Sequence, residues 1–243
     1  MRRVRTAWSL AFAVMVLGCG ARRAPAPARV EGPRDVAGLY WGRWSEVPDG
    51  MRVAVWLHVD GSTVRGSWDL PPWHGELAGR WRDDAFVGAW RQEGVIAIQQ
   101  RRERAVRLVR GGDGTLREEG AADGEAIELR RAGRARTAPS PGLWLGRWTG
   151  LPPGVAVETQ LTAPADGTFR ATYRYQLREG SFDGEALAGG GMSIRWREVS
   201  ARDGVARGAG RLLPDVLGLR GGYGVDDRED GTGIWTLEAL DVR

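Results

Sequence analysis

The chain contains the heptapeptide Gly38-Leu39-Tyr40-Trp41-Gly42-Arg43-Trp44 in two versions. It recurs as Gly142-Leu143-Trp144-Leu145-Gly146-Arg147-Trp148, 104 positions later (38 to 142). The match runs without a gap to Leu57 and Leu161, and the offset then grows one residue at a time. Such single steps are expected where loops between equivalent strands differ in length. The sequence therefore predicts the duplication of a unit of about 100 residues, which is enough for a small domain.

Within a unit, apolar and polar residues alternate with a period of two, which is typical of β-strands. Val53, Val55 and Leu57 alternate with their neighbours, and the turn pair Asp60-Gly61 follows. Further short segments, separated in several places by Gly and Asp, are expected at 64–68, 75–82, 86–91, 95–100, 105–110 and 126–131. Strands spaced by about 8–12 residues favour an antiparallel meander.

We therefore predict an all-β fold of two duplicated antiparallel meander units, each a small up-and-down β-barrel of roughly eight strands. Closure into a barrel removes the exposed edges of a sheet. The units are expected at residues 36–131 and 142–243, joined by a linker at 132–141 that contains Arg, Ala and Pro. The pattern leaves open whether the units share one sheet and whether the barrels are hollow or filled.

The tripeptide Gly-x-Trp recurs along the chain, and in a strand its Gly and Trp lie on the same face. On Gly42-Arg43-Trp44 and Gly146-Arg147-Trp148, the first strands resemble those of lipocalin-type and avidin-like barrels. The resemblance implies that each Trp closes one end of its barrel. Each unit is shorter than a lipocalin, and no second lipocalin motif is present.

The first residues form an export signal rather than part of the fold. A basic start is followed by an apolar run from Ala7 to Leu17, about half the length that a membrane-spanning helix needs. Val16-Leu17-Gly18-Cys19 resembles the lipobox of bacterial lipoproteins. The resemblance implies cleavage of the signal peptide 1–18 and acylation of Cys19, palmitate included, which anchors the chain to a membrane.

Residues 19–35 then form a tether rich in Pro, Ala and Arg, which is expected to be extended. Gly20 follows Cys19 where an Asp would resemble an inner-membrane retention signal, so we expect a cell-envelope protein at the outer membrane. The expected partners are the membrane, through Cys19, and a small hydrophobic ligand or an envelope protein.

Composition excludes several classes of function. The chain has 243 residues and a formal net charge of +4. Three of its arginines (Arg2, Arg3 and Arg5) lie in the signal, so the mature chain has almost no net charge and no nucleic-acid partner is expected. One Cys and two His make a metal centre improbable. We find no catalytic motif, and we expect neither enzymatic activity nor a cofactor.

Two groups of residues are candidates for binding. Trp41, Trp56 and Trp73 are candidates for a ligand or partner surface, because alternation cannot place every Trp ring in a core. Their alternative role is packing. Arg101, Arg102 and Arg104 are candidates for an anion patch, and their alternative role is to blunt a strand edge with charge.

The sequence thus favours a membrane-anchored, non-catalytic binding module for a small hydrophobic or envelope ligand. The alternative is a protein-interaction lipoprotein with filled barrels, such as an envelope assembly factor or a hydrolase inhibitor.

Overall fold

The computed structural model describes residues 34–94, 101–122, 125–133, 138–163, 167–216, 218–226 and 228–240. These residues form sixteen strands and one short 3-10 helix, η1 (Arg34–Val36). The strands of the first unit are β1 (Gly38–Arg43), β2 (Met51–Asp60), β3 (Thr63–Leu70), β4 (Trp73–Arg82), β5 (Ala85–Gly94), β6 (Arg102–Arg110), β7 (Leu116–Glu118) and β8 (Glu128–Arg131). Those of the second are β9 (Gly142–Trp148), β10 (Val155–Thr162), β11 (Thr168–Tyr175), β12 (Arg178–Ala186), β13 (Met192–Ser200), β14 (Gly204–Asp215), β15 (Gly218–Val225) and β16 (Gly233–Ala239).

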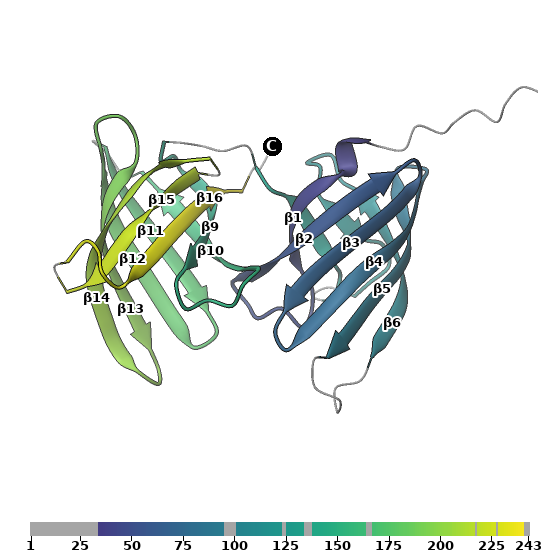
Figure 1. Cartoon of the computed structure of the whole chain (residues 1–243), viewed down its shortest axis with the longest axis horizontal. Helices are drawn as coiled ribbons and strands as arrows, with labels where there is room; N and C mark the ends of the chain where they lie inside the picture. Colours follow the sequence, from purple (N-terminus) through teal and green to yellow (C-terminus); the bar gives the residue numbers. More distant parts are fainter. Residues whose placement is uncertain are drawn as a thin grey trace, which may run out of the picture. The chain divides into compact units, whose positions relative to one another are not determined.

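Each unit closes into an antiparallel barrel, as predicted. Within each unit, every strand pairs with the next one along the chain, and the first strand pairs with the last, β1 with β8 and β9 with β16. Figure 1 shows the two rings, one from β1 onward in purple and blue and one ending in yellow at β16. No helix in the described part of the chain is long and apolar enough to cross a membrane.

The period of two places one face of every strand inside a barrel. On β3, Val64, Gly66 and Trp68 are buried, whereas the residues between them are exposed. The predicted segments correspond to strands with slightly different ends, but β7 was not anticipated, and the segment predicted at 95–100 lies outside the described residues. Trp73, a candidate for the binding surface, is the first residue of β4.

The two barrels also share hydrogen bonds, so their strands form one continuous sheet within one compact unit. Met51, Arg52 and Val53 of β2 pair with Val157, Ala156 and Val155 of β10. The duplication makes Ala156 the equivalent of Arg52 (52 to 156), so an internal pseudo-twofold axis passes between these two residues. The copies of the repeat thus meet through the same surface, as in an isologous dimer interface.

Gly50 and its equivalent Gly154 lie in turns that contact the other barrel at this junction. Gly50 has a φ of 75°, and a Cβ atom there would lie 1.8 Å from the backbone oxygen of Arg174. The Gly50 oxygen accepts a hydrogen bond from the Glu158 amide, and the Gly154 oxygen accepts one from the Ala54 amide. The turn before β2 therefore requires glycine for both its conformation and its contact with β11.

Outward-facing side chains become buried where the barrels meet. Trp41, Leu145, Ala156 and Leu240 form a small apolar cluster there. The Trp41 indole N–H donates to Glu238, 3.4 Å away, whose second carboxylate oxygen is buried without a partner among the described residues. Burial raises the pKa of Glu238, although Trp41 and Arg147 oppose this shift.

Arg52 is a second buried ionisable residue at this junction. Its side chain is 2% exposed and forms ion pairs with Glu158 of the second barrel at 2.6 Å and Glu128 of the first at 3.2 Å. It also donates to the Trp41 carbonyl. Burial of Glu128 opposes its ionisation, but the guanidinium groups of Arg130 and Arg52 outweigh this effect and lower the pKa of Glu128.

Candidate functional site

One end of the second barrel contains a cavity of about 530 Å³, which we call the second-barrel mouth. Six aromatic side chains from five strands line it, together with a few aliphatic and polar residues. The aromatic residues are Trp148, Tyr173, Tyr175, Trp196, Tyr223 and Trp235. A cavity of this size and lining is typical of a small-molecule site.

Strand geometry explains why these rings converge. Tyr173 and Tyr175 are two residues apart on β11, so both point into the barrel. Trp148 follows from β9, and its ring centroid lies 5.3 Å from those of Tyr173, Tyr175 and Trp235. These separations are those of favourable aromatic pairs. Trp148 is only partly buried, so it presents ring surface to the cavity.

Tyr173 lies flat against β12 because Gly180 stands opposite it in the strand register. A Cβ atom at Gly180 would lie 1.9 Å from the tyrosine ring. Any larger residue at Gly180 would push this ring away from the wall of the barrel.

Glu198 is the polar centre of the second-barrel mouth. Arg178 donates to one carboxylate oxygen at 2.6 Å, and the hydroxyls of Tyr175 and Tyr173 donate to the other at 3.2 Å and 3.3 Å. Arg178 also binds Asp203, which accepts from Ser200. Because both Glu198 oxygens have partners, the network is satisfied without a ligand.

The surroundings of the two tyrosines favour their protonated form. Burial, and then the charge of Glu198, raises the pKa values of Tyr173 and Tyr175. Both hydroxyls therefore stay protonated at neutral pH and remain donors. In the ranges that the structure describes, no group of His, Cys, Asp and Glu is arranged to hold a metal ion.

The equivalent end of the first barrel is filled. Trp44, Trp68 and Trp90 occupy the positions of Trp148, Tyr173 and Trp196, since Trp68 and Tyr173 stand opposite the equivalent glycines Gly75 and Gly180. The centroids of the three tryptophan rings are 4.8–5.0 Å apart, and all three are buried. Trp44 and Trp90 also line a hollow of about 560 Å³ at this end, whose other lining residues are mainly Glu, Arg and small residues.

The rim of the second-barrel mouth exposes aliphatic side chains. Leu177, in the turn between β11 and β12, is 73% exposed, and Val205, at the start of β14, is 59% exposed. Their neighbours Gln176 and Ala206 line the cavity. The entrance to the aromatic interior is thus apolar at two of its turns.

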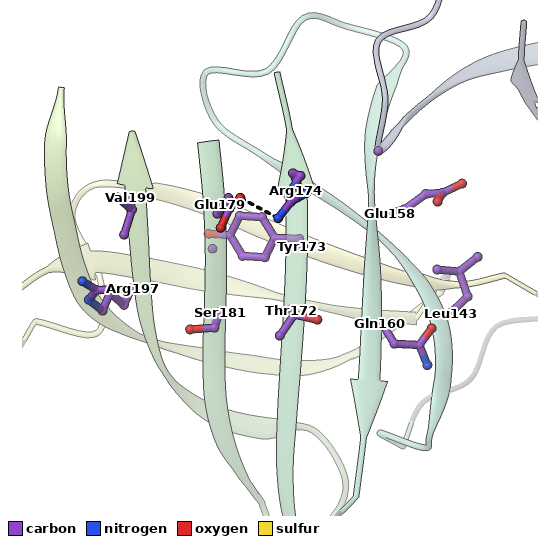
Figure 2. Close-up of a pocket in the computed structure, with 12 residues that line it drawn as sticks. Leu143, Glu158, Gln160, Thr172, Tyr173, Arg174, Glu179, Ser181, Arg197 and Val199 are labelled. Carbon is purple, nitrogen blue, oxygen red and sulfur yellow. Dashed lines mark ion pairs between the residues drawn. The ribbon is translucent and has the colours of Figure 1, made fainter. Parts of the chain in front are cut away.

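A second hollow, of about 710 Å³, lies on the outer face of the second barrel. Figure 2 shows its lining, in which Arg174 and Glu179 form an ion pair of 2.6 Å. Gln160, Thr172 and Arg197 are also exposed side chains of this face. It is a polar surface groove, whereas the second-barrel mouth leads into an aromatic interior.

The three predicted tryptophans lie in three different environments. Trp41 is 1% exposed and packs where the barrels meet. Trp56 is 61% exposed on the outer face of the first barrel. Trp73 is partly buried against the core, with the Arg102 guanidinium 5.9 Å from its ring centroid. None of them lines the second-barrel mouth.

The predicted anion patch is exposed but neutralised by ion pairs. Arg101 pairs with Glu103 at 3.5 Å, and Arg102 with Glu46 at 3.1 Å. Arg104 binds both carboxylate oxygens of Glu118. The three arginines are thus held by carboxylates rather than presented together to an anion.

Sequence reasoning missed Tyr173, Tyr175, Arg178 and Glu198. One signal was available, since three of the four tyrosines in the chain line the second-barrel mouth and two of them form Tyr173-Arg174-Tyr175. Cys19, the signal peptide and the tether up to residue 33 lie outside the described residues.

Comparison of the chain with protein-family models, with curated proteins and with solved structures gives no match.

Proposed function

We propose that this chain is a lipid-anchored protein of the bacterial cell envelope whose second barrel binds a small hydrophobic ligand. The observation that supports binding is the contrast between two equivalent barrel ends. The two ends have hollows of similar volume, about 560 Å³ and about 530 Å³, but mainly charged and small residues line the first, whereas six aromatic side chains line the second. Apolar surface of this kind favours an apolar ligand, because each Å² removed from water contributes about 25 cal/mol.

The ligand would enter past Leu177 and Val205 and place its apolar part against Trp148 and Tyr175. Its polar end would lie near Arg178, which is partly exposed beside the cavity. A single-chain amphiphile matches this arrangement of apolar interior and charged margin.

Replacing Trp148 with alanine is expected to weaken binding of such a ligand at least tenfold, because it removes the ring at the centre of the aromatic lining. Calorimetric titration of the full chain with lauric acid measures this change. Leu177→Ser offers a second variant at an exposed position, for which we expect a smaller loss of affinity. Trp56→Ala is the matched control, since it deletes an exposed tryptophan far from the cavity lining. Equal affinity in all four chains, or no saturable binding to the wild type, would refute the proposal.

The anchor is a separate part of the proposal, supported by the lipobox-like Val16-Leu17-Gly18-Cys19. Cys19→Ser is expected to abolish incorporation of labelled palmitate and to release the chain from the membrane fraction, because the thiol is the acylated group. Outer-membrane location is checked by fractionating envelopes. Retention of palmitate by the variant would rule out lipidation at this residue.

A protein partner is the second candidate function, and one observation favours it. Trp56 lies on the outer face of the first barrel, whose interior is filled. Tryptophan is enriched at protein interfaces relative to the rest of the protein surface. Cross-linking of Trp56→Ala and wild-type chains in envelopes would show whether a partner contacts this face.

A further inference from the structure

Three exposed arginines gather on the outer face of the second barrel, and the proposed function does not use them. Arg195 and Arg197 are two residues apart on β13, with the buried Trp196 between them. Arg207 lies on β14, directly opposite Arg197 in the strand register. Directly opposed residues have Cβ atoms about 4.5–5.5 Å apart, and like charges in such positions destabilise the pair.

This opposition is unusual in the molecule. Elsewhere in the described strand registers, an arginine stands opposite a carboxylate, as in Arg91 with Glu76, or opposite an uncharged residue. Arg197 and Arg207 are the only two arginines that the described registers place face to face. The repulsion between two directly opposed arginines therefore occurs at this pair and at no other described pairing.

The three arginines also have no carboxylate partner among the described residues. No ion pair joins Arg195, Arg197 or Arg207 to any residue that the structure describes, in contrast to Arg101, Arg102 and Arg104. Asp183 stands opposite Arg195, but Arg170 holds its carboxylate at 2.8 Å. The three side chains line a groove of about 1200 Å³, whose other charged lining residues are Arg170, Asp183, Glu185, Asp226 and Glu229. Figure 2 shows Arg197 from the neighbouring groove, apart from the Arg174–Glu179 ion pair.

We infer that this groove binds a phosphate group between Arg197 and Arg207, with Arg195 as the third contact. A guanidinium presents a planar fork of donors that matches phosphate oxygens, and such charge-assisted hydrogen bonds are among the strong ones. A phosphate dianion between two opposed guanidinium groups converts their repulsion into two attractions. Glu185, Asp226 and Glu229 in the same groove disfavour a long polyanion, so a compact phosphate is the better fit.

The phosphate could belong to a lipid headgroup or to a soluble phosphate ester, and two probes distinguish them. The Cys19→Ser full chain, which lacks the lipidated thiol, is titrated with glycerol 3-phosphate and with vesicles of phosphatidylglycerol in phosphatidylcholine. Binding of glycerol 3-phosphate identifies a site for soluble phosphates, and binding of vesicles alone identifies a headgroup site. Absence of binding to both probes overturns the inference.

In the Cys19→Ser full chain, the double substitution Arg197→Gln/Arg207→Gln is expected to raise the dissociation constant for the bound probe at least tenfold. Arg101→Gln/Arg102→Gln is the matched control, because it removes the same charge from exposed residues that are already ion-paired. We expect the control to stay within about twofold of the parent chain. Equal losses in both double variants would indicate a general charge effect and overturn the site. Trp148→Ala should leave phosphate binding unchanged, which separates this test from that of the second-barrel mouth.

Discussion

Replacing Arg52 with alanine is expected to lower the free energy of unfolding by about 3 kcal/mol, because it leaves the partly buried Glu158 without its ion-pair partner and removes one of the three arginines bound to Glu128. The Arg52 side chain is 2% exposed, and the side chains of Glu128 and Glu158 are 12% and 23% exposed. Three hydrogen bonds of the guanidinium disappear at once, to Glu158, to Glu128 and to the Trp41 carbonyl. The loss should exceed that of any surface ion pair.

The position of Arg52 explains why so much depends on one side chain. It lies beside the internal pseudo-twofold axis, where its duplicated equivalent is Ala156. One large cation thus faces one small residue, and the arginine joins acidic groups from the two barrels. Because Arg52 binds Glu158 across the junction, its removal weakens the contact between the barrels as well as the first barrel itself.

Urea unfolding measures this prediction, with Arg170→Ala as the control. Arg170 forms an exposed ion pair with Asp183, which should contribute no more than about 1 kcal/mol. Arg52→Ala/Glu158→Ala should lose less stability than the sum of the two single variants, since the second substitution removes one stranded charge. A loss below about 1 kcal/mol for Arg52→Ala would mean that water replaces the arginine at this junction.

The barrels could be predicted from the sequence because duplication and alternation are local signals. Val53, Val55 and Leu57 specify an inward face without knowledge of any partner strand. The same alternation places Arg52 and Trp41 on the outward face, where a sequence reading expects solvent. Both are buried, since β2 pairs with β10 and the second barrel covers them. Contact between the barrels has no periodic signal, so it was not predicted.

The candidate sites also depend on contacts between residues that are not neighbours in the sequence. Arg101, Arg102 and Arg104 form a basic run in the sequence, but Glu46 and Glu118, which neutralise two of them, come from distant positions. Conversely, Arg197 and Arg207 are ten residues apart (197 to 207) and become neighbours only through the register of β13 and β14. The hydrogen-bond network of the second-barrel mouth likewise depends on Tyr173 of β11 and Glu198 of β13, which lie on either side of β12. Charge runs along a chain therefore predict poorly which charges meet in a sheet.

Trp68→Ala is expected to lower the free energy of unfolding by about 3–5 kcal/mol, the usual cost of removing a buried large aromatic ring. Trp68 is buried and contacts both Trp44 and Trp90, so its removal opens a void in the filled end of the first barrel. Thermal unfolding monitored by circular dichroism measures the change. Trp56→Ala provides the control, because an exposed tryptophan should contribute no more than about 0.5 kcal/mol.

Trp68→Ala also tests whether the two barrels have different functions. If the first barrel serves as packed structure and the second as the binding unit, Trp68→Ala should reduce stability while the affinity of the second-barrel mouth for lauric acid stays unchanged. Trp148→Ala should do the reverse, since Trp148 is partly buried beside an existing cavity and borders the ligand. A loss of ligand affinity in Trp68→Ala without loss of stability would place the ligand in the first barrel. That result would reverse the assignment of roles, because the tryptophan cluster would then be a binding surface rather than a core.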